Sequence, residues 1–351
     1  MKRKNVLYLL GVCAAIALGA CGGQETASQT ESVEVAEDET LASEVTESLQ
    51  GTMAMEEASE DMKETEAMDA VTEVQESEAE EVEEQASGEY DVPENFAAVQ
   101  DGVNYGTMVE ITYDSKTTGT TRKANIVLPP DYSEEKEYPV LYLLHGIGGN
   151  HNEWKNGQAA NVIGNLVAAG ETSEMIVVMP NVRARANDGS NPSDIYSLEH
   201  YQAFDNFIND LRDDLMPFME ANYAIATGKE NTAIAGLSMG GRESLYIGFS
   251  MPETFGYIGA FCPAPGLLPY SNFGVSEEGL FTEETFTLPE GSDNFVMIVA
   301  GLSDTVVGAF PSTYHQTLEN NGVEHVFYET PGGHDFGVWR HGLYNFAKHI
   351  F

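Results

Sequence analysis

The feature that most constrains this chain is an apolar strand that runs directly into a serine flanked by glycines. The segment Ala233–Gly241 reads AIAGLSMGG, and a helical pattern begins immediately after it. Gly236 and Gly240 carry no Cβ, so the chain can turn sharply and present Ser238 at the end of the strand. Because strand, turn and helix follow one another without a gap, we expect Ser238 to be a nucleophile above a helix amino terminus.

Before and after this turn, over residues 108–351, apolar runs rich in Val and Ile alternate with longer helical patterns. This alternation predicts an α/β fold, a mostly parallel central sheet with helices on both faces. The run YPVLYLLHG (138–146) is apolar on both faces, as a buried parallel strand is, and runs 108–113 and 123–129 are typical of paired edge strands. The other expected strands are 175–180, 232–236, 257–262, 295–301 and 325–330, and the expected helices are 159–169, 201–222, 239–249, 311–320 and a last one ending at 351.

Two polar residues follow later strands in the order that a serine nucleophile requires. Asp304 comes after strand 295–301 and His334 after strand 325–330. Sites in open parallel sheets lie at the carboxyl ends of the strands, so both should share one edge with Ser238. We expect His334 to accept the Ser238 proton and Asp304 to fix its tautomer.

Rival groups have poorer positions. Asp293 precedes its strand, Glu329 falls inside one, and Cys262 ends an apolar run as a small buried residue would. The histidines at 145, 200, 315, 325, 341 and 349 fall on strand ends, helices or surface patterns. No group of His, Cys and Asp has the spacing of metal ligands, so a metal mechanism is not expected.

Backbone donors for an oxyanion are expected at two positions. The first is the N–H of Met239, the residue after the nucleophile. The second is Ile147, because His145-Gly146 followed by Ile147-Gly148-Gly149 resembles the oxyanion-loop motif of lipases and esterases. In that motif His145 would shape the loop.

Four motifs together resemble one family. VLYLLHGIGGN with Trp154 soon after, AIAGLSMGG, GLSDTVVG and GGHDFGVW are similar to the esterase-D-like branch of the α/β-hydrolases, and within it to carbohydrate esterase family one. That family includes feruloyl esterases and acetyl xylan esterases, and the likeness runs from about Gly106 to the carboxyl terminus. It implies ester hydrolysis through an acyl-enzyme on Ser238, Asp304 and His334, no cofactor, and an acylated polysaccharide such as xylan as substrate.

The resemblance leaves the substrate open. Trp154, Tyr270 and Trp339 are candidates to stack on a sugar or an aromatic acyl group, with buried packing as the alternative. Arg242 and Glu243 depart from the small residues of many relatives, which suggests an altered pocket rim. Acetyl and feruloyl specificity are both possible. So are transfer to a sugar, as in mycolyltransferases, and carbohydrate binding without catalysis, which the intact triad argues against.

The first 92 residues differ in composition from the rest. Residues 1–20 read as a signal peptide, with a basic start and an apolar stretch too short to span a membrane. Leu18-Gly19-Ala20-Cys21 resembles a bacterial lipobox, which implies lipid on Cys21 and an anchor at the outer face of the cell membrane.

Residues 21–92 contain 24 acidic residues and one basic residue, and predict a disordered tether. We expect one esterase domain over 93–351. The net charge of −41 makes nucleic acid an improbable partner.

Overall fold

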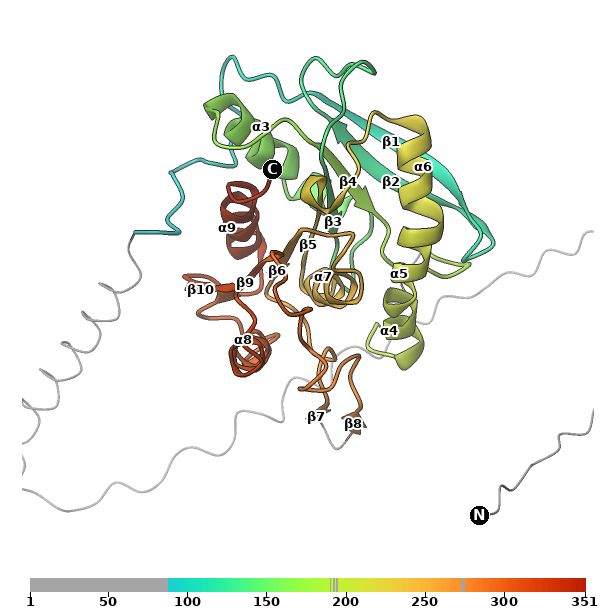
Figure 1. Ribbon diagram of the computed structural model, residues 1–351, viewed down its shortest axis with the longest axis vertical. Coiled ribbons are helices and arrows are strands. Elements are labelled where there is room, and N and C mark those ends of the chain that lie inside the picture. Colours follow the sequence, from blue (N-terminus) through green and yellow to red (C-terminus); the bar gives the residue numbers. More distant parts are fainter. Residues whose placement is uncertain (1–87, 190, 192, 194, 273–274) are drawn as a thin grey trace, which may run out of the picture. The chain divides into compact units, whose positions relative to one another are not determined.

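The computed structural model describes residues 88–351 except 190, 192, 194, 273 and 274 (Figure 1). The expected signal peptide, the lipidation site Cys21 and nearly all of the expected tether lie outside the described residues. Among the residues that are described, no helix combines the length and apolar character that a membrane span needs.

A mixed sheet of eight strands forms the centre of the described fold, in the order β1-β2-β4-β3-β5-β6-β9-β10. The first two strands form an antiparallel hairpin, β2 also pairs antiparallel with β4, and all pairs from β4 to β10 are parallel. The expected α/β fold is therefore confirmed. The strands are β1 (Thr107–Ser115), β2 (Thr120–Leu128), β3 (Val140–Leu144), β4 (Ile176–Pro180), β5 (Thr232–Leu237), β6 (Tyr257–Phe261), β9 (Phe295–Gly301) and β10 (Val326–Thr330).

The order of the strands reverses at β3. From β3 the chain moves outward to β4 and then returns to place β5 on the other side of β3. Connections that leave neighbouring strands in opposite directions open a crevice at their carboxyl ends. This rule places the expected binding position between the residues that follow Leu144 and the turn that follows Leu237.

Helices follow most of the parallel strands, as the sequence predicts. The helical segments are α2 (Glu153–Asn156), α3 (Ala159–Ala169), α4 (Leu198–Asp205), α5 (Phe207–Asp210), α6 (Met216–Asn222), α7 (Met239–Ser250), α8 (Phe310–Asn320), α9 (Phe336–Ala347), the π-helical turn η1 (Leu211–Leu215) and the 3₁₀ turn η2 (Lys229–Asn231). The single helix expected over 201–222 is instead divided between α4 and α6. Its π-helical turn comes just before Pro217, which has no N–H to donate to the preceding turn.

Side chains alternate across β6 and thereby assign helices to the two faces of the sheet. Phe261 packs edge-on against Trp154 and against Phe346 of α9. On the opposite face, Ile258 fills the space that a Cβ on Gly248 of α7 would need. Since alternate residues of a strand point to opposite faces, α9 and α7 cover opposite sides.

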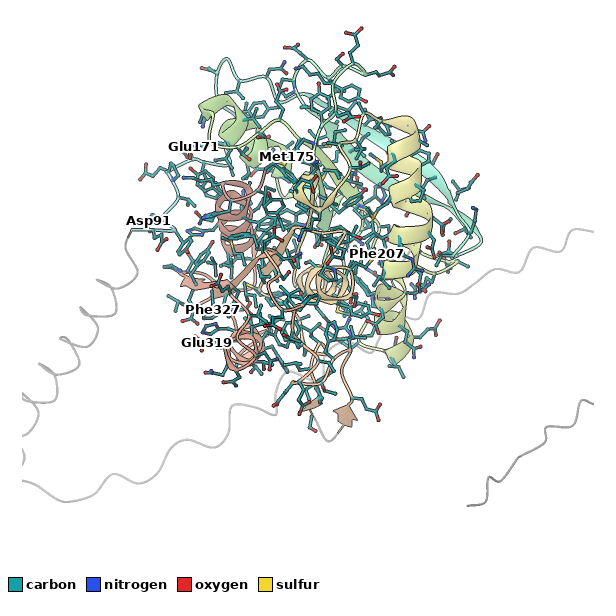
Figure 2. The ribbon with its side chains drawn as sticks, viewed as in Figure 1. Asp91, Glu171, Met175, Phe207, Glu319 and Phe327 are labelled. Atoms are coloured by element: carbon teal, nitrogen blue, oxygen red, sulfur yellow. The ribbon has the colours of Figure 1, made fainter. Side chains whose placement is uncertain are left out.

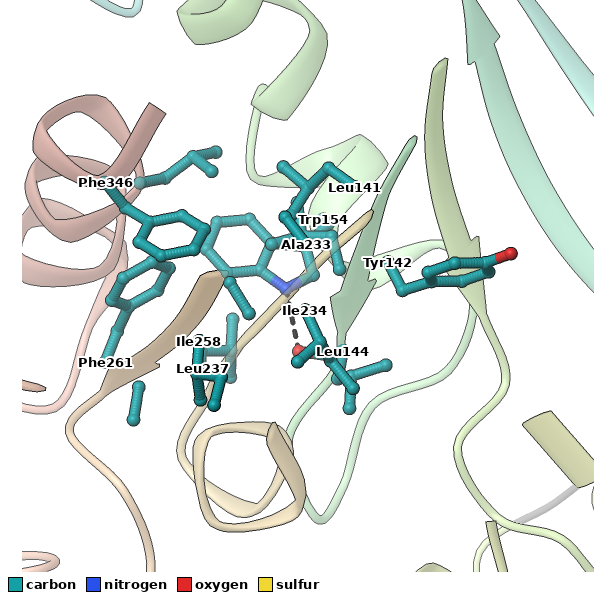
Figure 3. Close-up of a cluster of buried hydrophobic side chains, with 14 of the residues drawn as sticks. Leu141, Tyr142, Leu144, Trp154, Ala233, Ile234, Leu237, Ile258, Phe261 and Phe346 are labelled. Atoms are coloured by element: carbon teal, nitrogen blue, oxygen red, sulfur yellow. Dashed lines mark hydrogen bonds between the residues drawn. The ribbon is translucent and has the colours of Figure 1, made fainter. Parts of the chain in front are cut away.

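The apolar core lies between these layers. Figure 2 shows side chains throughout the fold: Met175 and Phe207 are buried, whereas Glu171 and Glu319 are exposed. Figure 3 shows the part of the core beneath the β5 turn, where Trp154 lies among side chains of β3, β5, β6 and α9. The rigid support for Ser238 is therefore apolar packing on both sides of the two central strands.

One element was not expected from the sequence. A short antiparallel ribbon, β7 (Tyr270–Asn272) and β8 (Val275–Glu277), forms within the polar segment 263–284. The segment begins at the carboxyl end of β6, so the ribbon belongs to the same edge of the sheet as Ser238.

Candidate active site

The side chains of Ser238, His334 and Asp304 form one chain of hydrogen bonds. Ser238 Oγ lies 2.8 Å from His334 Nε2, and His334 Nδ1 lies 2.7 Å from Asp304 Oδ2. Because a carboxylate only accepts, Nδ1 carries the proton and Nε2 presents a lone pair to the serine hydroxyl. Three residues from three strand ends thus have the geometry of a nucleophile, a base and an orienting acid.

Ser238 occupies a strained turn between β5 and α7. Its φ of 53° and ψ of −118° are unusual for a residue with a side chain, and such a conformation costs about 1–3 kcal/mol. Phe261 and Ala264 hold the turn: Ser238 N–H donates to Phe261 O at 2.8 Å, and Ala264 N–H donates to Ser238 O at 3.0 Å. The end of β6 therefore fixes the direction in which Ser238 points.

The flanking glycines serve a different purpose from the one expected. Neither Gly236 nor Gly240 has a positive φ; the sharp conformation belongs to Ser238 itself. A Cβ on Gly236 would instead collide with the backbone of Gly240, and a Cβ on Gly240 would collide with the backbone of Leu144 and His145. The glycines are needed because three backbone segments meet here.

Asp304 is held as a carboxylate. Burial alone would raise its pKa, but the hydrogen bond from His334 and those from the backbone N–H groups of Val307 and Val306 outweigh burial and lower the pKa. The two N–H groups reach Oδ1 at 3.2 and 2.9 Å, which leaves Oδ2 for His334. The acid is therefore ready to stabilise an imidazolium.

The segment 145–149, called loop 145–149 below, passes beside the serine. A Cβ on Gly146 would lie 3.4 Å from Ser238 Cβ. His145 is buried beneath this loop: its Nε2 accepts the Val182 N–H at 2.8 Å, so its Nδ1 donates to Gly146 O at 2.7 Å. Burial lowers the pKa of His145 to about 3, which keeps the ring neutral and preserves this pattern. His145 shapes the loop, as predicted.

Two more side chains determine which backbone groups of loop 145–149 remain available. Glu153 Oε2 accepts the Gly146 N–H at 2.7 Å, and His200 Nε2 donates to Ile147 O at 2.9 Å. Burial raises the pKa of Glu153, against the opposing effect of the Gly146 N–H. Its carboxylate also lies where a Cβ on Gly149 would be. No signal in the sequence pointed to Glu153 or His200.

The two expected oxyanion donors are both available. Within the described residues, no hydrogen bond uses the N–H of Ile147 or of Met239. Since Gly146 O accepts from His145, the Ile147 N–H at the other end of that peptide points the opposite way. Met239 begins α7, where the first N–H groups have no partner within the helix. Both positions therefore remain candidates to bind an oxyanion.

Two of the three candidates for stacking on substrate are buried, which is the alternative that the sequence left open. Trp154 is 1% exposed, donates from Nε1 to Leu144 O at 2.8 Å and packs on Phe261, so it is a core residue (Figure 3). Trp339 is 8% exposed, and its ring packs perpendicular to the His334 ring, with the ring centroids 5.0 Å apart. A large aromatic side chain is buried where another layer of the fold packs over it. The sequence pattern around the residue does not show whether such a layer is present. Tyr270 is half-buried against Phe310 and remains a candidate.

Arg242 and Glu243 do not form a pocket rim, contrary to expectation. Arg242 is 3% exposed and Glu243 is fully buried; Arg242 binds both Glu243 and Asp205 of α4. Burial raises the pKa of Glu243 to about 8, although Arg242 opposes the shift. This buried charged group links α7 to α4.

Cys262 contributes more than the expected small apolar residue. It is fully buried with a φ of 48°, and its thiol lies close to the Asp304 carboxylate. Burial raises the pKa of this thiol, so it is a neutral neighbour of the acid. Cys262, Asp304 and His334 place potential metal-ligating atoms within 4.8 Å of one another. Two of these atoms already bind each other in the hydrogen-bonded chain.

The rival acids lie elsewhere. Asp293 is exposed and pairs with Lys229, and Glu329 is exposed within β10. A large surface hollow lies at the opposite edge of the sheet, lined by residues 287–296 and 321–326. We place the site at Ser238 because a nucleophile, a base and an acid form one hydrogen-bonded chain there, and the described residues that line the hollow form no such chain.

Comparisons with known proteins agree with this site. The Esterase family model matches residues 115–350. The structure of a CE1 ferulic acid esterase from Anaeromyces mucronatus, in complex with ferulic acid, is 41% identical with a TM-score of 0.71, covering 76% of this chain and 98% of that one.

Two curated relatives are longer. An endo-1,4-beta-xylanase/feruloyl esterase of Xylanibacter ruminicola is 29% identical over 74% of this chain, and endo-1,4-beta-xylanase Y of Acetivibrio thermocellus is 25% identical over 70%. This chain matches only 33% and 23% of their lengths, respectively. The family match over most of the described fold, together with the CE1 structure, leads to one conclusion: the chain belongs to the Esterase family and is a CE1-like esterase with an α/β-hydrolase fold.

Proposed function

We propose that this protein is a serine carboxylesterase that hydrolyses feruloyl esters on plant polysaccharide such as xylan. The observation that carries the proposal is the hydrogen-bonded chain Ser238–His334–Asp304. The backbone N–H groups of Ile147 and Met239 add to it, because no hydrogen bond between described residues uses either of them. The feruloyl group is supported by the 41% identity to the ferulic acid esterase. Xylan is supported by the two xylanase relatives.

The first half-reaction forms an acyl-enzyme. Ser238 Oγ attacks the ester carbonyl carbon while His334 Nε2 takes the hydroxyl proton, and the carbonyl oxygen becomes an oxyanion. The N–H groups of Ile147 and Met239 bind that oxyanion, and each such donor contributes about a hundredfold or more to the rate. His334 then returns its proton to the sugar oxygen as the ester C–O bond breaks.

The second half-reaction releases the acid. A water molecule attacks the acyl-Ser238 ester while His334 takes its proton. The bond between the acyl carbon and Ser238 Oγ then breaks as His334 returns the proton to Oγ, which releases the carboxylic acid and restores Ser238. Asp304 remains ionised throughout and stabilises the imidazolium in both steps. None of these steps calls for a metal ion, so we expect EDTA to leave turnover unchanged.

The N-terminal residues concern location. We propose that lipid on Cys21 anchors the chain at the outer face of a bacterial membrane, and that the acidic segment 21–92 separates the esterase domain from that surface. Like charges extend such a segment, and the spacing would favour access to insoluble polysaccharide. Replacing Cys21 by Ser should release the protein from the membrane without changing kcat on a soluble ester.

The deciding experiment uses feruloylated and acetylated xylo-oligosaccharides as alternative substrates. We expect ferulic acid to be released with a much higher kcat/KM than acetic acid, measured by chromatography of the free acids. Faster release of acetate would contradict the feruloyl assignment but keep the esterase. Acyl transfer to added sugar in place of hydrolysis would contradict hydrolysis itself.

A further inference from the structure

Two histidines that are ten positions apart in the sequence meet at the edge of the sheet opposite Ser238. His315 lies on α8, and His325 immediately precedes β10. His315 Nδ1 is 2.8 Å from His325 Nε2, and the ring centroids are 5.0 Å apart. The proposed function uses neither residue.

The environment of the two rings fixes their orientation. His325 Nδ1 donates to Val323 O at 2.8 Å, so a neutral His325 presents a lone pair at Nε2. The His315 ring stacks on Phe327, with centroids 4.3 Å apart and planes within 9°. Its Nε2 faces the Glu319 carboxylate at 3.7 Å. Figure 2 shows Glu319 and Phe327 together in the region of α8 and β10.

We propose that His315 Nδ1 and His325 Nε2 bind one divalent transition-metal ion of the zinc, nickel or copper class, with water completing its coordination. Imidazole is a preferred ligand of these ions. Two imidazole nitrogens at about 2.0–2.1 Å from one ion lie about 3.0–3.4 Å apart, depending on the bond angle. The pair therefore needs to open by only a few tenths of an ångström.

The groups around the pair are of the kind that orient the ligands in a histidine metal site. Ligating histidines usually donate their other ring N–H to a carbonyl or a carboxylate, which orients the ring. His325 already does so through Val323 O. For His315, the proton moves from Nδ1 to Nε2, where Glu319 faces it, so the ring stays neutral and coordinates through Nδ1.

The site is reachable from solvent and distant from the chemistry. The His315 side chain is 27% exposed, and His325 borders the surface hollow described above. Strand β10 separates His325 from His334 by about five strand residues, or roughly 17 Å. A bound ion would join α8 to β10 and stabilise the folded state without changing ester turnover.

The test is titration of the full-length protein with ZnCl₂ or NiCl₂, followed by calorimetry. We expect one strong site, lost in His315→Ala and in His325→Ala, and an affinity about tenfold weaker in Glu319→Gln. His349→Ala is the matched control, because His349 also stacks on a phenylalanine, Phe295, yet is bonded to Asn345 O and not to a second histidine. With zinc at ten times its Kd, Tm should rise by about 3–5 °C in wild type and not in His315→Ala.

Location can be observed directly. A crystal soaked in ZnCl₂ should show an anomalous peak between His315 Nδ1 and His325 Nε2. Equal zinc affinity in wild type and in folded His315→Ala would overturn the proposal. So would zinc that inhibits ester turnover at the concentration that fills the strong site, because this would place the ion at Cys262, Asp304 and His334.

Discussion

The triad and loop 145–149 meet at Ser238, and they are held in place in different ways. Ser238, His334 and Asp304 bond directly to one another from the ends of three strands. The loop has no such direct chain: His145 and Glu153 fix its backbone from below, and His200 of α4 fixes it from the side. Reactive side chains are therefore presented by the sheet, whereas reactive backbone groups depend on side chains that hold the loop through hydrogen bonds.

The triad should be the less tolerant of the two. Ser238→Ala removes the nucleophile, and we expect turnover of a simple aryl ester to fall by about a millionfold, since triad members act as one unit. Steady-state kinetics measure the loss, and circular dichroism should show an unchanged fold. Residual activity above about a hundredth of wild type would refute the nucleophile.

Asp304→Asn tests the far end of the triad. The amide keeps the shape but neither enforces the His334 tautomer nor stabilises the imidazolium, so kcat should fall about ten-thousandfold. Asp293→Asn is the matched control, because that exposed carboxylate pairs with Lys229 and should leave kcat unchanged. If Asp293→Asn lost activity and Asp304→Asn did not, Asp293 would be the acid, and the comparison between the triad and the loop would fail.

Glu153 tests whether the loop depends on a side chain that lies outside it. Glu153→Ala releases the Gly146 N–H, and a displacement of the loop by about 1 Å should lower kcat about a hundredfold with a smaller change in KM. Glu153→Gln keeps an acceptor oxygen and should recover most of the activity. If both variants behaved alike, the carboxylate charge rather than the hydrogen bond would matter, and the contrast between the two regions would fail.

The smallest expected effect concerns Glu243, which is buried beside Arg242 on α7. The pKa of Glu243 is raised to about 8 in the fold, against 4.5 as its ordinary value, so the folded state keeps a proton that the unfolded state has lost. The stabilisation is full below about pH 4.5 and declines as pH rises towards 8, by at most about 1.4 kcal/mol per pH unit. Relative to Glu243→Gln, wild type should lose stability between pH 5 and 8.

Urea unfolding of both proteins at pH 5, 6.5 and 8 measures this difference. A constant difference in the free energy of unfolding would mean that Glu243 stays ionised with Arg242. In that case the ratio of ester turnover at pH 8 to turnover at pH 6.5 should be the same in wild type and in Glu243→Gln.

The order of elements was readable from the sequence because local patterns determine it. Strand and helix periods predicted the sheet, and the positions of Ser238, Asp304 and His334 after their strands predicted that they meet. The carboxyl ends of parallel strands share one edge, so position along the chain translates into proximity. The same reasoning placed the donors Ile147 and Met239, whose role remains a prediction.

Tertiary structure alone decided which side chains are buried and which remote residues meet. It put Trp154 in the core, buried Arg242 and Glu243 with Asp205, and set Glu153 beneath loop 145–149. These outcomes depend on the packing of layers and on hydrogen bonds between different elements, whose partners are seven residues apart for Glu153 and Gly146 and 37 apart for Arg242 and Asp205. The periodicity of a single helix or strand carries no information about the packing of layers or about hydrogen bonds to other elements. The sequence therefore determined which residues form the candidate triad, but not which side chains hold that triad and loop 145–149 in place.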